Sequence, residues 1–287
     1  MWAILSFLTA FFESTKDVFS KKVLNNVDEY VVAWSLRFFA LPFLLPILFF
    51  TEIPKLGDKF LFALIIGGSL NIVATILYMR AIKLSDLSIA TPMVTFTPLF
   101  LLITSPLIVK EFPSAFGIVG IFLIIVGSYM LNINKKSQGY LAPFKALMEQ
   151  KGPKLMLLVA FIWSITSNFD KVGIQNSSPT FWLICINIFI AFFMFPIVLY
   201  KSRENLKKVK SNLKILVPIG LMGGLTLICQ MEAISLTLVA YVIAIKRTSA
   251  IISVIFGCLI FKEKGIKERL AGAMVMVAGV LFITLFH

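Results

Sequence analysis

Histidine is nearly missing from this sequence of 287 residues, because its single copy is His287. Catalytic Ser-His-Asp triads, most catalytic zinc sites and histidine proton relays need this side chain inside the fold. The sequence also contains no Walker-type Gly-Lys-Ser/Thr loop and no Gly-rich nucleotide loop. We therefore expect no metal, no cofactor and no nucleotide-driven pump in this chain.

Cysteine and charge are scarce as well. Cys185, Cys229 and Cys258 each lie inside an apolar run without paired spacing, which argues against a disulfide framework and a CxxC metal site. Charged residues make up 14% of the chain and hydrophobic residues 59%, whereas soluble proteins have about 25% charged residues. Such an excess of apolar side chains needs lipid as its solvent. The composition therefore predicts an all-α polytopic membrane protein with the bilayer as a partner.

The charges that remain are mostly positive, with 27 Lys and Arg against 14 Asp and Glu. They cluster in short gaps between apolar runs, which is typical of loops beside anionic headgroups. We therefore expect a plasma-membrane protein and no nucleic-acid partner. The first apolar segment, 1–12, lacks the basic start of a signal peptide, so we interpret it as part of a membrane helix.

Apolar runs of about 20 residues, the length that crosses a bilayer, recur along the whole chain. We predict ten transmembrane helices, at 1–20, 31–51, 60–80, 86–109, 113–133, 155–175, 179–200, 213–235, 236–261 and 268–286.

The second half of the sequence repeats the first. At an offset of 150, Lys21 and Pro46 fall on Lys171 and Pro196. At an offset of 152, Lys110, Glu111, Gly120 and Gly127 fall on Lys262, Glu263, Gly272 and Gly279. Five is an odd number, so two five-helix copies must cross the membrane in opposite directions. We expect one repeat at 1–133, a basic linker at 134–154 and an inverted second repeat at 155–287.

The repeated motifs resemble the EamA domains of the drug/metabolite transporter superfamily. The first copy has Ala81-Ile82-Lys83-Leu84-Ser85, Ala90-Thr91-Pro92 and Lys110-Glu111, and the second has Trp163-Ser164, Ala233-Ile234-Ser235-Leu236 and Lys262-Glu263. The second copy departs from the pattern, with Asn187 in place of Arg37 and Lys246-Arg247 in place of Val94-Thr95. The resemblance implies transport of small solutes such as amino acids, metabolites or drugs.

Polar residues inside the predicted spans are candidates for a solute site, because a charge at the bilayer centre costs about 2.5–3.5 kcal/mol. Glu13, Lys16 and Asp17 share one helix face. They either line a cavity, with a carboxylate that couples protons, or neutralise one another. Glu13 resembles a glutamate in the first span of small multidrug-resistance transporters. From the other spans we add Asn71, Tyr78, Thr91, Thr95, Asn168, Gln230 and Tyr241, although such groups often only join helices.

Lys246 and Arg247 lie near the middle of the ninth predicted span, too deep for their charges to reach the headgroups easily. Two interpretations are open. The pair binds a carboxylate or phosphate of an anionic solute, for which Arg247 suits bidentate contact, or it forms ion pairs with Glu13 or Asp17.

Small residues recur at steps of seven in the fifth and tenth spans, at Gly120, Gly127, Gly272 and Gly279. They serve either a homodimer or packing within the chain. Glu111 and Glu263 end the fourth and ninth spans, and we expect them to have a structural role.

We predict a secondary transporter that moves a small metabolite by alternating access. The alternative is a membrane-embedded enzyme acting on a lipid-linked substrate. Most Lys and Arg lie in gaps after odd-numbered spans, which predicts that both termini are outside the cell. The family resemblance implies the opposite orientation.

Overall fold

The computed structural model describes residues 1–112, 117–131, 145 and 149–285, and no strand occurs among them. His287 and most of the predicted linker at 134–154 lie outside these residues. The helices of the first half are α1 (Trp2–Val23), α2 (Glu29–Phe38), α3 (Leu41–Leu44), η1 (Leu45–Phe50), α4 (Phe60–Leu84), α5 (Leu87–Ala90), η2 (Thr91–Phe96), α6 (Thr97–Ile108) and α7 (Gly117–Met130). Those of the second half are α9 (Lys151–Gln175), α10 (Pro179–Ser202), η4 (Arg203–Leu206), α11 (Lys207–Ser211), α12 (Leu213–Leu236), α13 (Val239–Lys246), α14 (Ser249–Phe261) and α15 (Ile266–Leu285).

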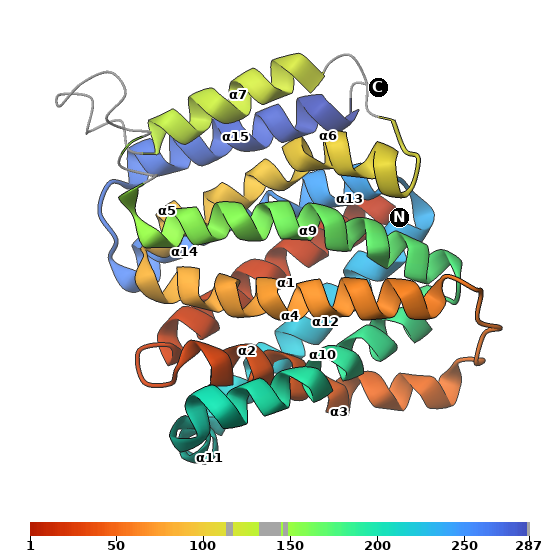
Figure 1. The fold of residues 1–287 in the computed structure, drawn as a ribbon. Coiled ribbons are helices and arrows are strands. Elements are labelled where there is room, and N and C mark those ends of the chain that lie inside the picture. Colours follow the sequence, from red (N-terminus) through yellow and green to blue (C-terminus); the bar gives the residue numbers. More distant parts are fainter. Residues whose placement is uncertain (113–116, 132–144, 146–148, 286–287) are drawn as a thin grey trace.

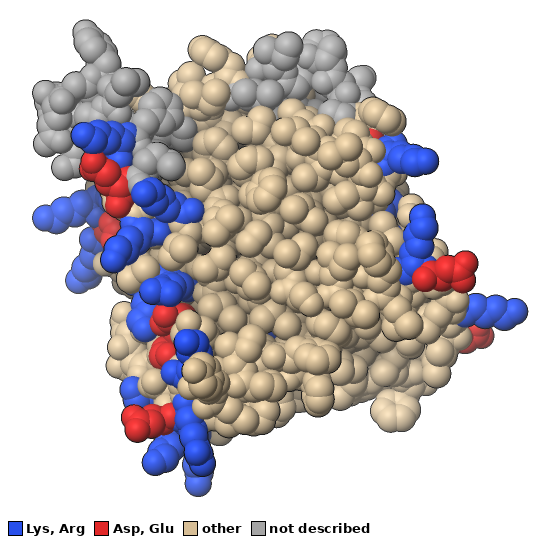
Figure 2. Space-filling view, in the orientation of Figure 1, with Lys and Arg blue, Asp and Glu red and all other residues tan. Residues whose placement is uncertain are grey.

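The molecule has the surface of a membrane protein. Figure 2 shows a broad band without charge between two charged edges of the face in view. Large apolar side chains are exposed, among them Phe49 (89%) and Leu107 (78%), which a protein in water would bury. Seven helical segments among the described residues are long and apolar enough to cross a bilayer. The chain is therefore an integral membrane protein, as its composition predicts.

Several spans are broken rather than continuous. Pro42 and Pro46 begin α3 and η1, while Pro92 and Pro98 begin η2 and α6. Proline favours the first turn of a helix and cannot donate a backbone hydrogen bond. Each proline therefore starts a new helical segment within a span that hydropathy alone presents as one run.

The two halves of the chain interleave rather than pack as separate bodies (Figure 1). The most extensive contacts join α1 with α12, α4 with α9, and α7 with α15. Helix α2 packs on α10 in the same way. Each of these pairs takes one helix from each half, so the core between them has walls from both.

The glycines at steps of seven lie between α7 and α15. A Cβ on Gly272 would stand 2.7 Å from the Gly127 carbonyl oxygen, and one on Gly279 would stand 2.6 Å from the Gly120 carbonyl oxygen. Figure 1 shows the two helices side by side. Of the two interpretations of these glycines, the structure therefore supports packing within the chain.

Candidate functional site

A polar cavity of about 70 Å³ lies at the centre of the helices, between the two halves. This volume has room for several water molecules. Side chains from α1, α2 and α4 form one part of its wall, and side chains from α9, α10, α12 and α13 form the rest. Its charged lining residues are Glu13, Lys16, Arg37, Asp170, Lys246 and Arg247, and its neutral polar residues are Asn71, Thr75, Tyr78, Thr166, Ser167, Thr226 and Gln230.

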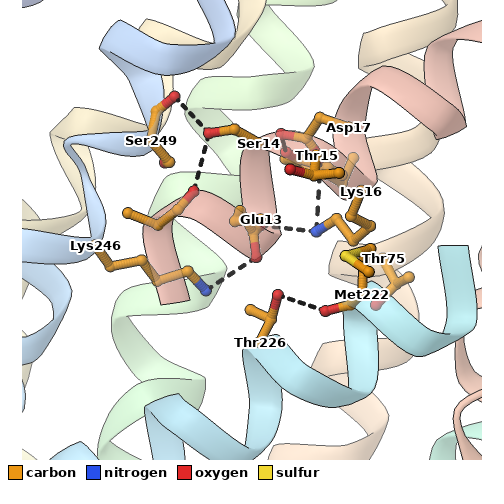
Figure 3. A network of polar contacts seen from close by, with 12 residues as sticks. Glu13, Ser14, Thr15, Lys16, Asp17, Thr75, Met222, Thr226, Lys246 and Ser249 are labelled. Atoms are coloured by element: carbon orange, nitrogen blue, oxygen red, sulfur yellow. Dashed lines mark hydrogen bonds and ion pairs between the residues drawn. The ribbon is translucent and has the colours of Figure 1, made fainter. Parts of the chain in front are cut away.

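Glu13 of α1 binds two lysines from opposite halves of the chain. Its carboxylate lies 2.8 Å from Lys16 Nζ and 3.4 Å from Lys246 Nζ, as Figure 3 shows. Lys246 Nζ also donates a hydrogen bond of 2.7 Å to Gln230 Oε1. All these side chains are buried, so the ion pairs offset the cost of placing charge inside the membrane.

Asp17 is the second carboxylate that lies close to Lys16, and it does not line the cavity. Lys16 Nζ is 3.6 Å from Asp17 Oδ1, and the Tyr78 hydroxyl donates a 2.6 Å hydrogen bond to Asp17 Oδ2. The predicted face of α1 therefore pairs its charges with one another and with Lys246 of the other half, and it also forms a cavity wall; proton coupling by its carboxylates stays a prediction.

Arg247 differs from Lys246 in that it lies beyond salt-bridge distance of every described carboxylate, and Glu13 and Asp17 act on its charge only at longer range. It follows α13, where its backbone N–H bonds to carbonyl groups of that helix. Its side chain is 1% exposed and lines the cavity, and its Nε has no hydrogen-bond partner. No described carboxylate forms an ion pair with it. A buried guanidinium without a counter-ion is costly, which is the state expected of a site that receives an anion.

Arg37 of α2 faces the same cavity from the first half. Its Nη2 donates a 3.3 Å hydrogen bond to Thr75 Oγ1, and its Nε has no partner. Among the described residues, it too forms no ion pair with a carboxylate. The nearby carboxylate of Asp170 instead accepts a 3.0 Å hydrogen bond from Trp182 Nε1.

Two aromatic rings lie against these cations. The rings of Tyr78 and Trp163 are 5.0 Å apart between centroids. Lys246 Nζ and Arg247 Cζ each lie 5.6 Å from the centroid of Trp163, and Lys16 Nζ lies 5.1 Å from that of Tyr78. Cation–π attraction at these distances stabilises the positive charge without neutralising it. The cavity therefore keeps its attraction for anions.

Of the predicted site residues, seven line the cavity: Glu13, Lys16, Asn71, Tyr78, Gln230, Lys246 and Arg247. Thr91 and Thr95 instead donate to the carbonyl oxygens of Leu87 and Pro92 within their own segment. Asn168 bonds to Thr104 and Ser105 where α9 meets α6. The ring of Tyr241 stacks on Trp2, with centroids 6.0 Å apart.

The cavity also contains residues that the sequence did not place in the site, among them Arg37, Trp163 and Asp170. Each of these three residues has a feature in the sequence that could have identified it. Arg37 is charged and lies inside an apolar run, Trp163 belongs to one of the motifs that carry the family resemblance, and Asp170 immediately precedes the repeated Lys171.

Two equivalent contacts tie the halves together at the ends of the helices. Glu111, which follows α6, accepts a 3.2 Å hydrogen bond from the Val239 backbone N–H at the start of α13. Glu263, which follows α14, accepts from the Leu87 and Ser88 backbone N–H groups of α5, at 2.8 and 2.9 Å. Partial burial raises the pKa of the Glu111 carboxyl above its usual range. We call these contacts the Glu111 cap and the Glu263 cap.

A lysine supports each cap. Lys21 Nζ donates to the carbonyl oxygens of Ile82 and Ser85 at the end of α4, at 2.7 and 2.5 Å. Lys171 Nζ donates to the carbonyl oxygens of Ile234 and Thr237 at the end of α12, each at 2.8 Å. The offset of 150 that relates these lysines in the sequence therefore relates equivalent contacts in the structure.

Residues 1–133 and 150–285 match the model of the EamA-like transporter family. The chain belongs to this family. Family membership makes it a membrane transporter of the drug/metabolite transporter superfamily and fits transport rather than an enzymatic role, as the repeated motifs predicted.

One solved crystal structure matches 99% of this EamA-like chain and 96% of its own chain, with a TM-score of 0.69 and 13% sequence identity. At that identity the similarity shows the fold alone. No curated protein matches this chain.

Proposed function

We propose that this EamA-like protein is a secondary transporter that moves a small metabolite by alternating access, with the central cavity as its solute site. The observation that supports this most is Arg247, a buried guanidinium that forms no salt bridge with any described carboxylate, in a cavity lined by both halves. The solute would be an amino acid, an organic anion or a drug-like solute, and an anionic group on it would bind this guanidinium. Bidentate contact with a carboxylate suits a guanidinium.

The proposed architecture is ten transmembrane helices in two inverted five-helix repeats, at 1–133 and 155–287, joined by the basic linker. Its support is the exchange of contacts between the halves. Helix α1 packs on α12 as α9 packs on α4, and the Glu111 cap repeats the Glu263 cap with the halves exchanged. Repeats related in this way can exchange conformations, which opens the cavity first to one side and then to the other.

The two caps are unequal, and this suggests which end is held more firmly closed. Arg269 of α15 supports the Glu263 cap with an ion pair to Asp86 of 3.0 Å and another to Glu263 of 3.6 Å. The Glu111 cap has one ion pair, to Lys171, of 3.9 Å. We propose that the end at Glu263 is closed in this conformation and that access begins at the end with Glu111.

Coupling to protons is proposed for Glu13 and Asp17. They share Lys16, so a proton on either carboxylate would release the lysine to the other. A solute anion bound near Lys246 would compete with Glu13 for the positive charge of this lysine.

The test is uptake of labelled carboxylates and amino acids into proteoliposomes that contain the purified chain. Arg247→Gln is expected to reduce uptake by about 100-fold, because loss of a buried charged contact typically costs 2–5 kcal/mol. Arg80→Gln is the matched control, since Arg80 is a half-exposed side chain at the surface, and it should leave uptake unchanged. Saturation at high solute concentration would distinguish a transporter from a channel.

Normal uptake by Arg247→Gln would remove this residue from the site. Absence of uptake in the unmodified protein for every solute, with a folded sample, would contradict transport itself.

A further inference from the structure

The charged side chains around the cavity fall into two groups with different net charge. The first, which we call the lysine group, consists of Glu13, Lys16, Asp17 and Lys246. Two cations and two carboxylates contact one another here, at 2.8, 3.4 and 3.6 Å. This group is neutral as it stands and needs no further ion.

The charges of the cavity that remain, which we call the arginine group, are those of Arg37, Arg247 and Asp170, and within this group Asp170 acts on Arg37. All three line the cavity, and each guanidinium has an Nε without a partner. Over both groups together, four cations and three carboxylates leave one positive charge uncompensated. Arg247 is 1% exposed and Asp170 is 6% exposed, while Arg37 is partly buried, so water screens the charge of Arg247 poorly.

We propose that the solute carries one net negative charge and that its carboxylate binds between Arg37 and Arg247. This inference rests on the proposed transport function and assigns the class of solute: a small carboxylate monoanion, including an acidic amino acid. With such a solute bound, the whole buried site becomes neutral. A zwitterion would leave the positive charge uncompensated, and a dianion would leave a surplus negative charge.

Asp170 sets this preference, because it subtracts one charge from the pair of guanidinium groups. Its carboxylate is held by the Nε1 of Trp182, a fully buried side chain, at 3.0 Å. It therefore cannot turn away from the cavity without breaking that hydrogen bond. Asp170→Asn keeps an acceptor for Trp182 and removes only the charge.

The experiment measures the thermal unfolding midpoint of the full-length chain in detergent with two series of solutes, since bound solute raises the midpoint according to its occupancy. The first series is succinamide, succinamate and succinate, which share one skeleton and carry zero, one and two negative charges. The second is glutamine, glutamate and N-acetylglutamate, with the same net charges. The unmodified protein should bind the monoanion of each series more tightly than its neutral and dianionic members, by about tenfold, because an unpaired buried charge is costly.

The variants should move this preference in opposite directions. Asp170→Asn raises the net charge of the site by one and should bind the dianions best. Arg37→Gln lowers it by one, keeps a donor for Thr75, and should bind the neutral members best. Lys207→Gln lowers the charge of the whole protein by one, as Arg37→Gln does, but at an exposed position of α11, and it should keep the order of the unmodified chain.

Three results would overturn the inference: no response to any member of either series, tightest binding of the dianions by the unmodified protein, or the same order in Asp170→Asn. None of them removes the proposed function. A chain that takes up neutral solutes, and loses that uptake in Arg247→Gln, is still a transporter with this cavity as its site.

Discussion

Glu13 is the residue on which the electrostatics of the cavity depend most. It accepts contacts from Lys16 of its own helix and from Lys246 of the other half. If Lys246 is removed, the carboxylate keeps one partner, but its contact with the second half is lost. The ion pair between Lys246 and Glu13 therefore links the two halves as well as neutralising charge.

Lys246→Gln is expected to lower both the unfolding midpoint and transport, because breaking a buried pair costs about 3–5 kcal/mol when no other partner remains and less where Lys16 stays. Adding Glu13→Gln should recover the midpoint, since the two amides can then bond to each other. The measurement is thermal unfolding of both single variants and the double variant. Arg247→Gln combined with Glu13→Gln serves as the contrast, and equal recovery in both pairs would contradict a specific link.

At this scale the sequence predicted charged cavity residues better than neutral ones. A charged side chain inside the membrane needs water or an oppositely charged partner. The depth of Lys246 and Arg247 in their predicted span was therefore sufficient to predict a polar site. Thr91 had an alternative, because a threonine hydroxyl can bond to a carbonyl of its own helix and needs no cavity. Periodicity cannot distinguish these two outcomes.

The pair of α7 and α15 is the element whose packing depends most on side-chain size. Gly127 and Gly272 oppose each other with no room for a methyl group. Such contact allows two backbones to approach closely in lipid, where van der Waals packing contributes much of the association between helices.

Gly272→Ala is therefore expected to destabilise the protein by about 1–3 kcal/mol, as overpacking of a close contact does. Gly224→Ala in α12 is the matched control, since a Cβ there meets its nearest atom at 3.7 Å, an ordinary contact. It should leave the unfolding midpoint unchanged or raise it slightly, because alanine favours helix. A similar fall in both variants would show that the close approach is not the cause.

The caps allow a second prediction for the elements. Glu263→Gln removes a carboxylate bonded to two backbone N–H groups and paired with Arg269, whereas Glu111→Gln removes one bonded to a single N–H. We expect Glu263→Gln to increase the opening of its own end, relative to the unmodified protein, by a larger factor than Glu111→Gln increases the opening of the other end, because it removes more contacts. Thiol labelling of single cysteines introduced at Leu87 and Val239, both buried at the caps, would measure this after the native cysteines are replaced. Each rate is compared with that of the same single-cysteine protein without the Glu substitution, and a larger increase at Val239 than at Leu87 would show that the Glu111 cap is the firmer one.

The sequence predicted where the helical spans lie, but it did not predict where a span is divided into shorter helical segments. The predicted span at 86–109 corresponds to Leu87–Ile108, yet it consists of three segments. Hydropathy measures only whether a stretch suits lipid. Whether a proline kinks a helix or starts a new segment depends on neighbours that satisfy the freed backbone groups.

For the whole molecule, charge is distributed unequally between the two ends. Lys and Arg gather at one edge of the face in Figure 2, with fewer at the other. The first edge includes the end of α10 together with α11, where Lys201, Lys207 and Lys208 lie. The positive-inside rule assigns this edge to the cytoplasm.

A reporter that is active only in the cytoplasm, fused after residue 287, is therefore expected to be inactive, because α15 runs away from the basic edge. The same reporter inserted after Lys208 should be active and serves as the control. An active reporter after residue 287 would give the orientation that the family resemblance implies.

The surplus positive charge of the arginine group has a kinetic consequence for the transport cycle. To return without solute, the carrier must close both ends around a charge that nothing neutralises, while the loaded carrier closes around a neutral site. Return of the empty carrier should then be the slow step, so the protein would exchange one solute for another faster than it accumulates either. Proteoliposomes preloaded with the transported monoanion should take up label about tenfold faster than empty ones, given the cost of an unpaired buried charge. Equal initial rates would mean that the empty site acquires its counter-ion from elsewhere.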